Sequence, residues 1–268
     1  MVFVIGHRGA SSSAPENTIP SFREAIELRV DFIEFDVHRS KDGVLVVIHD
    51  STLDRTTDMR GPVSQFTLQQ LKKMDAGSWF SPRFRGVQIP TVEEVLDLAK
   101  GKVSVAPEIK ASAIEKDLTN AIIGKDMIYS SMILIGRNYE AASRIKSLEP
   151  RIPIQADIIP VSELMARKGR SANERGNLGP KEREGLLNES LDPLSRNPIN
   201  IASIHKTDLA WEGIVDVCHR RGVLANAWPV NDREGMIKCL DSGIDFMTTD
   251  NPQLATSAYT KTGHEQGK

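Results

Sequence analysis

The sequence predicts a (β/α)8 barrel, and three observations support this fold class. First, short apolar runs alternate with amphipathic stretches of helical length along most of the chain, a pattern typical of a parallel sheet with crossover helices. Second, eight such runs occur within 268 residues, which is an ordinary length for one barrel of this kind. Third, charged side chains follow several runs directly, at the strand ends where such barrels carry their active sites.

The expected elements alternate in chain order. The expected strands are Val2–Ile5, Phe32–Val37, Val103–Ile109, Met132–Ile135, Ile154–Ala156, Ile199–Ile204, Val223–Trp228 and Ile244–Met247. The expected helices are Thr18–Leu28, Val92–Ala99, Ala113–Ile123, Tyr139–Leu148, Trp211–Arg221 and Arg233–Asp241. We interpret residues 1–260 as one barrel domain and residues 261–268 as a frayed tail.

Two segments interrupt the alternation. Residues 39–89 contain the turn Asp42-Gly43 and the apolar run Val44–Ile48, and we interpret them as an insertion on the top of the barrel. Residues 166–197 are polar and charged. We favour a solvated loop there, with a short helix after Pro180, over the alternative of a basic lid above the active site.

Composition excludes several classes of protein. The formal net charge of −2 gives no electrostatic footprint for binding nucleic acid. No apolar stretch approaches the length of a membrane span, and the first apolar run is too short for a signal peptide. We therefore expect a cytoplasmic protein, although the sequence does not say whether an export signal once preceded it. Cys218 and Cys239 are expected to be core residues, and the oligomeric state stays open between monomer and homodimer.

Three carboxylates are expected to meet at the top of the barrel. Glu34 and Asp36 are two residues apart on the second strand, so both side chains point to the same face. Glu108 lies at the end of the third strand. Grouped carboxylates need cations between them, and oxygen ligands suit a hard ion such as Mg²⁺ or Ca²⁺. The alternative is a salt-bridged set, with the cations supplied by Arg8, Lys110 and Arg39.

Two histidines are candidates for acid–base chemistry. His7 follows the first strand, and His49 ends the apolar run of the insertion. Imidazole titrates near neutral pH, so one ring can accept a proton while the other donates one. With a metal ion and the cations of Arg8 and Lys110, this set suits a phosphodiester, whose transition state gathers negative charge. The other histidines are expected to lie outside the site: His38, His205, His219 and His264.

At these residues the sequence resembles the glycerophosphodiester phosphodiesterase family. The motifs that carry the resemblance run through nearly the whole chain: His7-Arg8-Gly9-Ala10, Pro15-Glu16-Asn17-Thr18, Glu34-Phe35-Asp36-Val37, Lys41-Asp42-Gly43, His49-Asp50 with Leu53 and Arg55, Ile89-Pro90-Thr91 with Glu94 and Leu96, Glu108-Ile109-Lys110, Trp228-Pro229-Val230-Asn231, Gly243-Ile244-Asp245 and Thr249-Asp250-Asn251-Pro252.

The resemblance implies a barrel with a small insertion after the second strand and a role for each candidate residue. His7 and His49 would be the general acid and base. Glu34, Asp36 and Glu108 would bind Mg²⁺ or Ca²⁺, and Arg8 and Lys110 would contact the phosphate. The implied reaction is hydrolysis of glycerophosphodiesters to an alcohol and sn-glycerol 3-phosphate, in which the glycerol 2-hydroxyl attacks phosphorus and water then opens the cyclic phosphate.

Some positions depart from the family pattern or stay open. The fourth strand is followed by Gly136-Arg137-Asn138 where the family often has Ser-Phe, and Trp228 precedes proline where the family often has threonine. Trp228 is a candidate wall for the glycerol moiety, with plain core as the alternative. Glu16 and Asn17 would shape the first loop, and we favour Asn17 as the N-cap of the following helix.

Two further functions compete with hydrolysis of small glycerophosphodiesters. The first is a lipid-cleaving lysophospholipase D or sphingomyelinase D-like enzyme, which would need an exposed apolar rim; Trp79, Phe80 and Phe84 could supply part of one. The second is a binding barrel without turnover, which would require the loss of a histidine or of a metal ligand.

Overall fold

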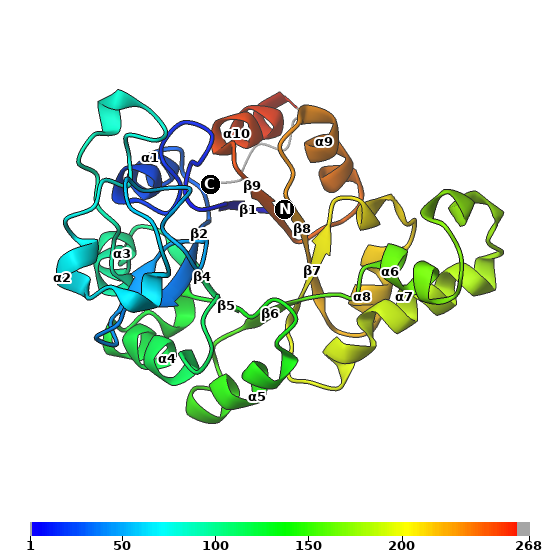
Figure 1. Cartoon of the computed structure of the whole chain (residues 1–268). Helices are drawn as coiled ribbons and strands as arrows, with labels where there is room; N and C mark the ends of the chain where they lie inside the picture. Colours follow the sequence, from blue (N-terminus) through cyan, green and yellow to red (C-terminus); the bar gives the residue numbers. More distant parts are fainter. Residues whose placement is uncertain (1, 262–268) are drawn as a thin grey trace.

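The structure, a computed structural model, describes residues 2–261 and confirms the predicted barrel (Figure 1). The sheet runs in the order β1-β9-β8-β7-β6-β5-β4-β2, and pairing of β1 with β2 closes it. All pairs between these barrel strands are parallel. The strands are β1 (Phe3–Gly6), β2 (Phe32–Arg39), β4 (Ser104–Ile109), β5 (Ile133–Leu134), β6 (Ile154–Asp157), β7 (Ile201–His205), β8 (Leu224–Trp228) and β9 (Phe246–Thr249). Each predicted strand is found within two residues of its expected bounds.

Helices surround this barrel and connect its strands (Figure 1). They are α1 (Ile19–Glu27), α3 (Val92–Ala99), α4 (Glu115–Gly124), α5 (Tyr139–Leu148), α6 (Val161–Arg167), α7 (Pro180–Ser195), α8 (Ile214–Arg220), α9 (Arg233–Asp241) and α10 (Pro252–Lys261). The six predicted helices are confirmed, whereas α6 and α10 were not predicted. The predicted tail lies outside the described residues except for Lys261, which ends α10.

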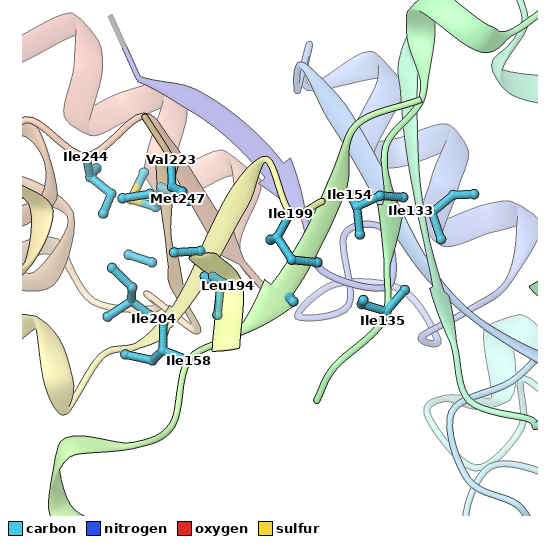
Figure 2. Close-up of a cluster of buried hydrophobic side chains, with 14 of the residues drawn as sticks. Ile133, Ile135, Ile154, Ile158, Leu194, Ile199, Ile204, Val223, Ile244 and Met247 are labelled. Carbon is cyan, nitrogen blue, oxygen red and sulfur yellow. The ribbon is translucent and has the colours of Figure 1, made fainter. Parts of the chain in front are cut away.

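Strand alternation divides the buried side chains into two layers. The odd-numbered positions of β2, Ile33, Phe35 and Val37, face the helices and join the largest core cluster. Figure 2 shows part of this layer, which includes Ile154 of β6, Ile204 of β7, Met247 of β9 and Leu194 of α7. A smaller cluster, which includes Ile5, Ala106 and Leu134, fills the barrel interior. The inward positions nearer the C-terminal strand ends are polar, and they form the site.

The insertion folds back onto the second strand. Its strand β3 (Leu45–Val47) pairs antiparallel with β2, with Val47 opposite Val37, and the short helix α2 (Leu68–Leu71) follows. The insertion has an apolar core of its own, formed by Val46, Ile48, Leu53, Val63, Leu71, Met74, Ala76 and Ile89. This core fixes the path of the chain just before and after His49.

The segment 166–197 differs from the predicted solvated loop. Residues 180–195 form α7, which is far longer than the short helix expected after Pro180. Its residues Leu186, Leu187, Leu191 and Leu194 are buried in the main core. The apolar positions were obscured by the many charges between them, and tertiary packing stabilises the helix. Several of these charges are paired, as in Lys168–Glu189 and Arg170–Glu182.

Among the described residues, no helix has both the length and the apolar character needed to cross a membrane.

Candidate active site

The three predicted metal ligands meet at the top of the barrel. Asp36 on β2 is directly opposite Glu108 on β4 in the strand register, and Glu34 lies two residues before Asp36. One carboxylate oxygen from each residue can be chosen so that all three lie within 4.8 Å of one another. Glu34 and Asp36 are each only 1% exposed. The alternation of side chains on the strands therefore produces the cluster that the sequence predicts.

Burial and mutual repulsion act strongly on these carboxylates. Burial and then the charge of Asp36 raise the pKa of Glu34 to about 8. Burial also raises the pKa of Glu108. The pKa of Asp36 is lowered, because the charges of Lys110 and Arg8 outweigh the effect of its burial. Without a bound cation, the repulsion and burial of these carboxylates therefore destabilise the folded protein.

The chemistry of this cluster fits a hard divalent cation. All three side chains offer oxygen ligands, which Mg²⁺ and Ca²⁺ prefer. Glu34 Oε1 and Asp36 Oδ1 are buried and have no hydrogen-bond partner, although such groups are normally satisfied in folded proteins. A cation bound between the carboxylates would satisfy both oxygens and would offset the repulsion.

Asn17 holds Asp36 and is not the helix cap that the sequence suggested. Its side-chain amide donates to Asp36 Oδ2 at 2.7 Å, and its carbonyl oxygen accepts from the Asp36 backbone N–H at 3.1 Å. The N-cap position belongs to Thr18, whose side chain makes no capping bond. Asn17 has φ +58°, a left-handed conformation that asparagine tolerates better than most residues. This turn directs the side chain into the barrel, so Asn17 leaves one oxygen of Asp36 available for a cation.

The two predicted phosphate ligands reach the same cluster. Lys110 Nζ lies 2.8 Å from Glu108 Oε1 and 3.3 Å from Asp36 Oδ1. Arg8 Nε lies 3.3 Å from Asp36 Oδ2, and the Arg8 backbone N–H donates to Glu34 Oε2 at 2.7 Å. Arg39 does not take part, because its guanidinium pairs with Asp117 outside the site. Of the three cations in the salt-bridged alternative, Arg8 and Lys110 therefore pair with the clustered carboxylates, and Arg39 does not.

Gly9 explains why the first loop can pass close to the helix behind it. Its φ is +88°, and a Cβ atom at this position would collide with the side chain and backbone of Ser21 on α1. Only glycine accepts both conditions without strain. The close approach fixes the backbone of Arg8, whose carbonyl accepts a hydrogen bond from Ser21 Oγ at 2.9 Å.

His7 is held in one orientation by Asp250. Its Nδ1 lies 2.6 Å from Asp250 Oδ1, and its Nε2 lies 4.0 Å from Glu34 Oε2. Burial lowers the pKa of His7, but the hydrogen bond with Asp250 and the charge of Glu34 outweigh it, so the pKa is raised. Asp250 is fixed in turn by Ser11 and Asn231. With Nδ1 engaged, Nε2 is the nitrogen available for proton transfer.

His49 is held in an equivalent way, by a carboxylate next to its Nδ1. Its Nδ1 lies 2.7 Å from Asp50 Oδ1. Arg55 donates to both Asp50 oxygens, at 2.8 and 3.0 Å, and to both Glu16 oxygens, at 2.7 and 2.8 Å. Glu16 also accepts from Arg8 at 2.8 Å. Arg55 therefore joins the loop of His49 to the first loop of the barrel, and bidentate pairs of this kind fix geometry well.

His38 lies outside the pocket lining, as expected, yet it contacts the backbone of His49. It shares a strand face with Asp36, because residues two apart point the same way. Its Nε2 lies 3.1 Å from the carbonyl oxygen of His49, so Nε2 must carry the proton and donate it. Burial lowers the pKa of His38, which keeps the ring neutral.

The site contains one cavity of about 170 Å³. The charged and titratable residues that line it are His7, Arg8, Glu34, His49, Glu108, Lys110 and Asp157. The rest of the lining is formed by Leu134, Gly136, Gln155, Ser203, Asn226, Trp228 and Thr248. Trp228 is thus part of the pocket wall and not of the core, and its ring packs edge-on against His205 with ring centroids 5.4 Å apart.

This geometry defines a class of protein, namely a barrel enzyme with an oxygen-rich cation site, two oriented histidines and two cations at the strand ends. Sequence comparison then gives the family. The model of the glycerophosphoryl diester phosphodiesterase family matches residues 7–254. The chain therefore belongs to this family, and its activity is the hydrolysis of glycerophosphodiesters.

Individual relatives agree with this assignment. A glycerophosphodiester phosphodiesterase of Caldanaerobacter subterraneus is 33% identical, over 97% of this chain and 98% of the relative. One of Bacillus subtilis is 29% identical, over 94% of this chain and 85% of the relative. Among solved structures, an Oleispira antarctica phosphodiesterase in complex with the product sn-glycerol-3-phosphate is 27% identical and covers 96% of each chain, with a TM-score of 0.74.

Several site residues had no role assigned from the sequence. Asp250, Asn231, Asp50 and Arg55 all lie in motifs that resemble the family, which was the available indication of their importance. Asp157 lies in no such motif. The only indication was its spacing. Asp157 lies two residues after Gln155, so the two side chains point to the same face of the strand.

Proposed function

We propose that the protein hydrolyses small glycerophosphodiesters with one divalent cation, Mg²⁺ or Ca²⁺, held by Glu34, Asp36 and Glu108. The clustering of these carboxylates, with two buried oxygens that lack hydrogen-bond partners, carries this proposal. When bound, the cation would neutralise a non-bridging phosphate oxygen and lower the pKa of the attacking hydroxyl.

Side chains of the protein bind the phosphate and transfer the protons. Arg8 and Lys110 pair with the phosphate oxygens as negative charge builds on them. One histidine accepts the proton of the attacking glycerol 2-hydroxyl through Nε2. The other histidine donates a proton to the alkoxide that leaves phosphorus, and the two rings exchange roles when water opens the cyclic phosphate. The carboxylates on both Nδ1 atoms keep each Nε2 directed to the reaction.

The size of the pocket favours a small diester over a lipid. A cavity of about 170 Å³ is smaller than the pockets of roughly 300–1,000 Å³ that enclose drug-sized ligands. Trp79 is 41% exposed and packs with Phe80 and Phe84, but none of the three lines the cavity. A cytoplasmic location and the oligomeric state, monomer or homodimer, stay predictions from the sequence.

The test is release of sn-glycerol 3-phosphate from glycerophosphocholine with Mg²⁺, with Ca²⁺ and with EDTA. We expect turnover with a divalent cation and loss of turnover in EDTA. His7→Ala and His49→Ala should each lose about 100-fold or more in kcat, which is the usual contribution of acid–base catalysis. His219→Ala is the matched control, since His219 pairs with Asp245 away from the pocket. Full activity in EDTA, or in either pocket variant, would contradict the proposal.

A further inference from the structure

Asp157 is a carboxylate that lines the same pocket as the proposed metal ligands Glu34 and Glu108. It ends β6 and faces inward, opposite Ser203 in the register of β7. Asp157 Oδ2 and Glu108 Oε1 each lie 3.8 Å from the point that a Cβ atom at Gly136 would occupy. The absence of a side chain at Gly136 therefore leaves open space between this carboxylate and the cation site.

The charge of Asp157 has no partner in the described part of the chain. Every other carboxylate at the site forms an ion pair: Glu34 and Asp250 with His7, Asp36 and Glu108 with Lys110, and Asp50 and Glu16 with Arg55. Asp157 takes part in no ion pair among the described residues, and its side-chain partner is the neutral hydroxyl of Ser203. The guanidinium of nearby Arg137 is committed to Glu163 at 2.6 Å.

This arrangement is unfavourable unless a ligand supplies positive charge. Burial raises the pKa of Asp157, because a desolvated carboxylate is less stable when ionised. The substrate carries a negative phosphate, so a second unpaired negative charge in the same pocket would weaken its binding. Lys110 and Arg137 act on Asp157 only from a distance, because they form ion pairs with Glu108 and Glu163. A cationic group on the organic part of the diester would supply a direct partner.

We propose that Asp157 is a specificity-determining residue, which binds an ammonium group on the alcohol arm of the substrate and favours diesters of cationic amino alcohols over neutral ones. The proposal rests on the proposed function for the reaction and adds a residue that selects among its substrates. The aromatic ring of Trp228 lines the same pocket, and such rings also favour cations.

Two diesters that differ only in this charge provide the test: glycerophosphoethanolamine, and glycerophosphopropanol, in which a methyl group replaces the ammonium. The wild-type enzyme should prefer the amine roughly tenfold in kcat/KM, mainly through KM. Asp157→Asn should bring the two kcat/KM values within about twofold of each other. The wild-type preference is measured independently of whether the variant folds.

Glu140→Gln is the matched control, because Glu140 is 91% exposed on α5 and does not line the pocket. It should retain the preference for the amine. Equal wild-type activity on both diesters, a preference that survives in Asp157→Asn, or an equal loss in Glu140→Gln would each overturn the assignment.

Calorimetric titration of the same diesters in EDTA separates this assignment from the proposed function. Tighter binding of the amine that disappears in Asp157→Asn, without turnover under any metal condition, would refute the proposed function and leave the assignment of Asp157 standing. Turnover of both diesters without any difference in their affinity would support the proposed function and refute the assignment of Asp157.

Discussion

Glu34→Gln should stabilise the metal-free protein while abolishing its cation site. Glu34 is buried, and its pKa is raised to about 8 from an ordinary value of 4.5. Between these two pH values the folded protein holds a proton that the unfolded chain releases, so stability falls as pH rises through this window. Glutamine has nearly the same shape, and its carbonyl oxygen can still accept from the Arg8 backbone N–H. The substitution removes the charge and keeps that contact.

The size of the effect follows from the shift in pKa. One pKa unit corresponds to about 1.4 kcal/mol. Keeping this carboxyl buried therefore costs the folded state about 3 kcal/mol at pH 7, and less than about 1 kcal/mol at pH 5. For a chain of this size, about 3 kcal/mol corresponds to a rise in Tm of roughly 6–12 °C. The gain of the variant over wild type should accordingly grow with pH.

The assay is denaturation by urea and by heat in EDTA at pH 5 and pH 8. Glu27→Gln is the control, because it makes the same chemical change on an exposed position of α1. Wild type and Glu27→Gln should lose stability together as pH rises, whereas Glu34→Gln should resist that loss. If Glu34→Gln showed the same pH dependence as wild type, the cost attributed to this buried carboxylate would be wrong. Added Mg²⁺ or Ca²⁺ should stabilise wild type and leave the variant unchanged.

Two other predictions concern the residues that hold the site in place. Asn17→Ala removes both hydrogen bonds to Asp36, so we expect the affinity for the divalent cation to fall about 10- to 100-fold, measured by calorimetric titration of the metal; an unchanged affinity would show that Asp36 is held without Asn17. Arg55→Lys replaces the double fork to Asp50 and Glu16 with a single ammonium group, so kcat should fall roughly tenfold with KM nearly unchanged, since Arg55 does not line the pocket. A change confined to KM would mean that Arg55 acts on substrate binding and does not position His49.

The sequence alone was enough to predict the barrel and the carboxylate cluster. Both depend on local, periodic properties of the chain: apolar runs of strand length define the strands, and alternation places Glu34 and Asp36 on one face. Because all eight parallel strands end at the same rim, residues at the ends of different strands meet without further information. The same reasoning placed Glu108, Lys110 and His7 beside them.

Tertiary structure decided the contacts between residues on separate loops. His49 reaches the site because β3 pairs back onto β2 and because Arg55 ties its loop to Glu16, and neither contact follows from sequence spacing. The sequence predicted Asn17 as a helix cap, and this prediction was wrong. The left-handed backbone of Asn17 and its hydrogen bonds to Asp36 depend on a loop path that no local pattern encodes. The long helix α7 was missed for the same reason, since its buried leucines are stabilised by the barrel against which they pack.

The contrast is clearest for the charges. The sequence identifies which groups ionise, and it places the three predicted metal ligands on inward strand positions. Whether a carboxylate has a partner depends on distances of a few ångströms between side chains from different strands, because ion-pair energies and desolvation vary steeply over that range. Only the folded chain therefore distinguishes Glu108, which pairs with Lys110, from Asp157, which forms no ion pair among the described residues.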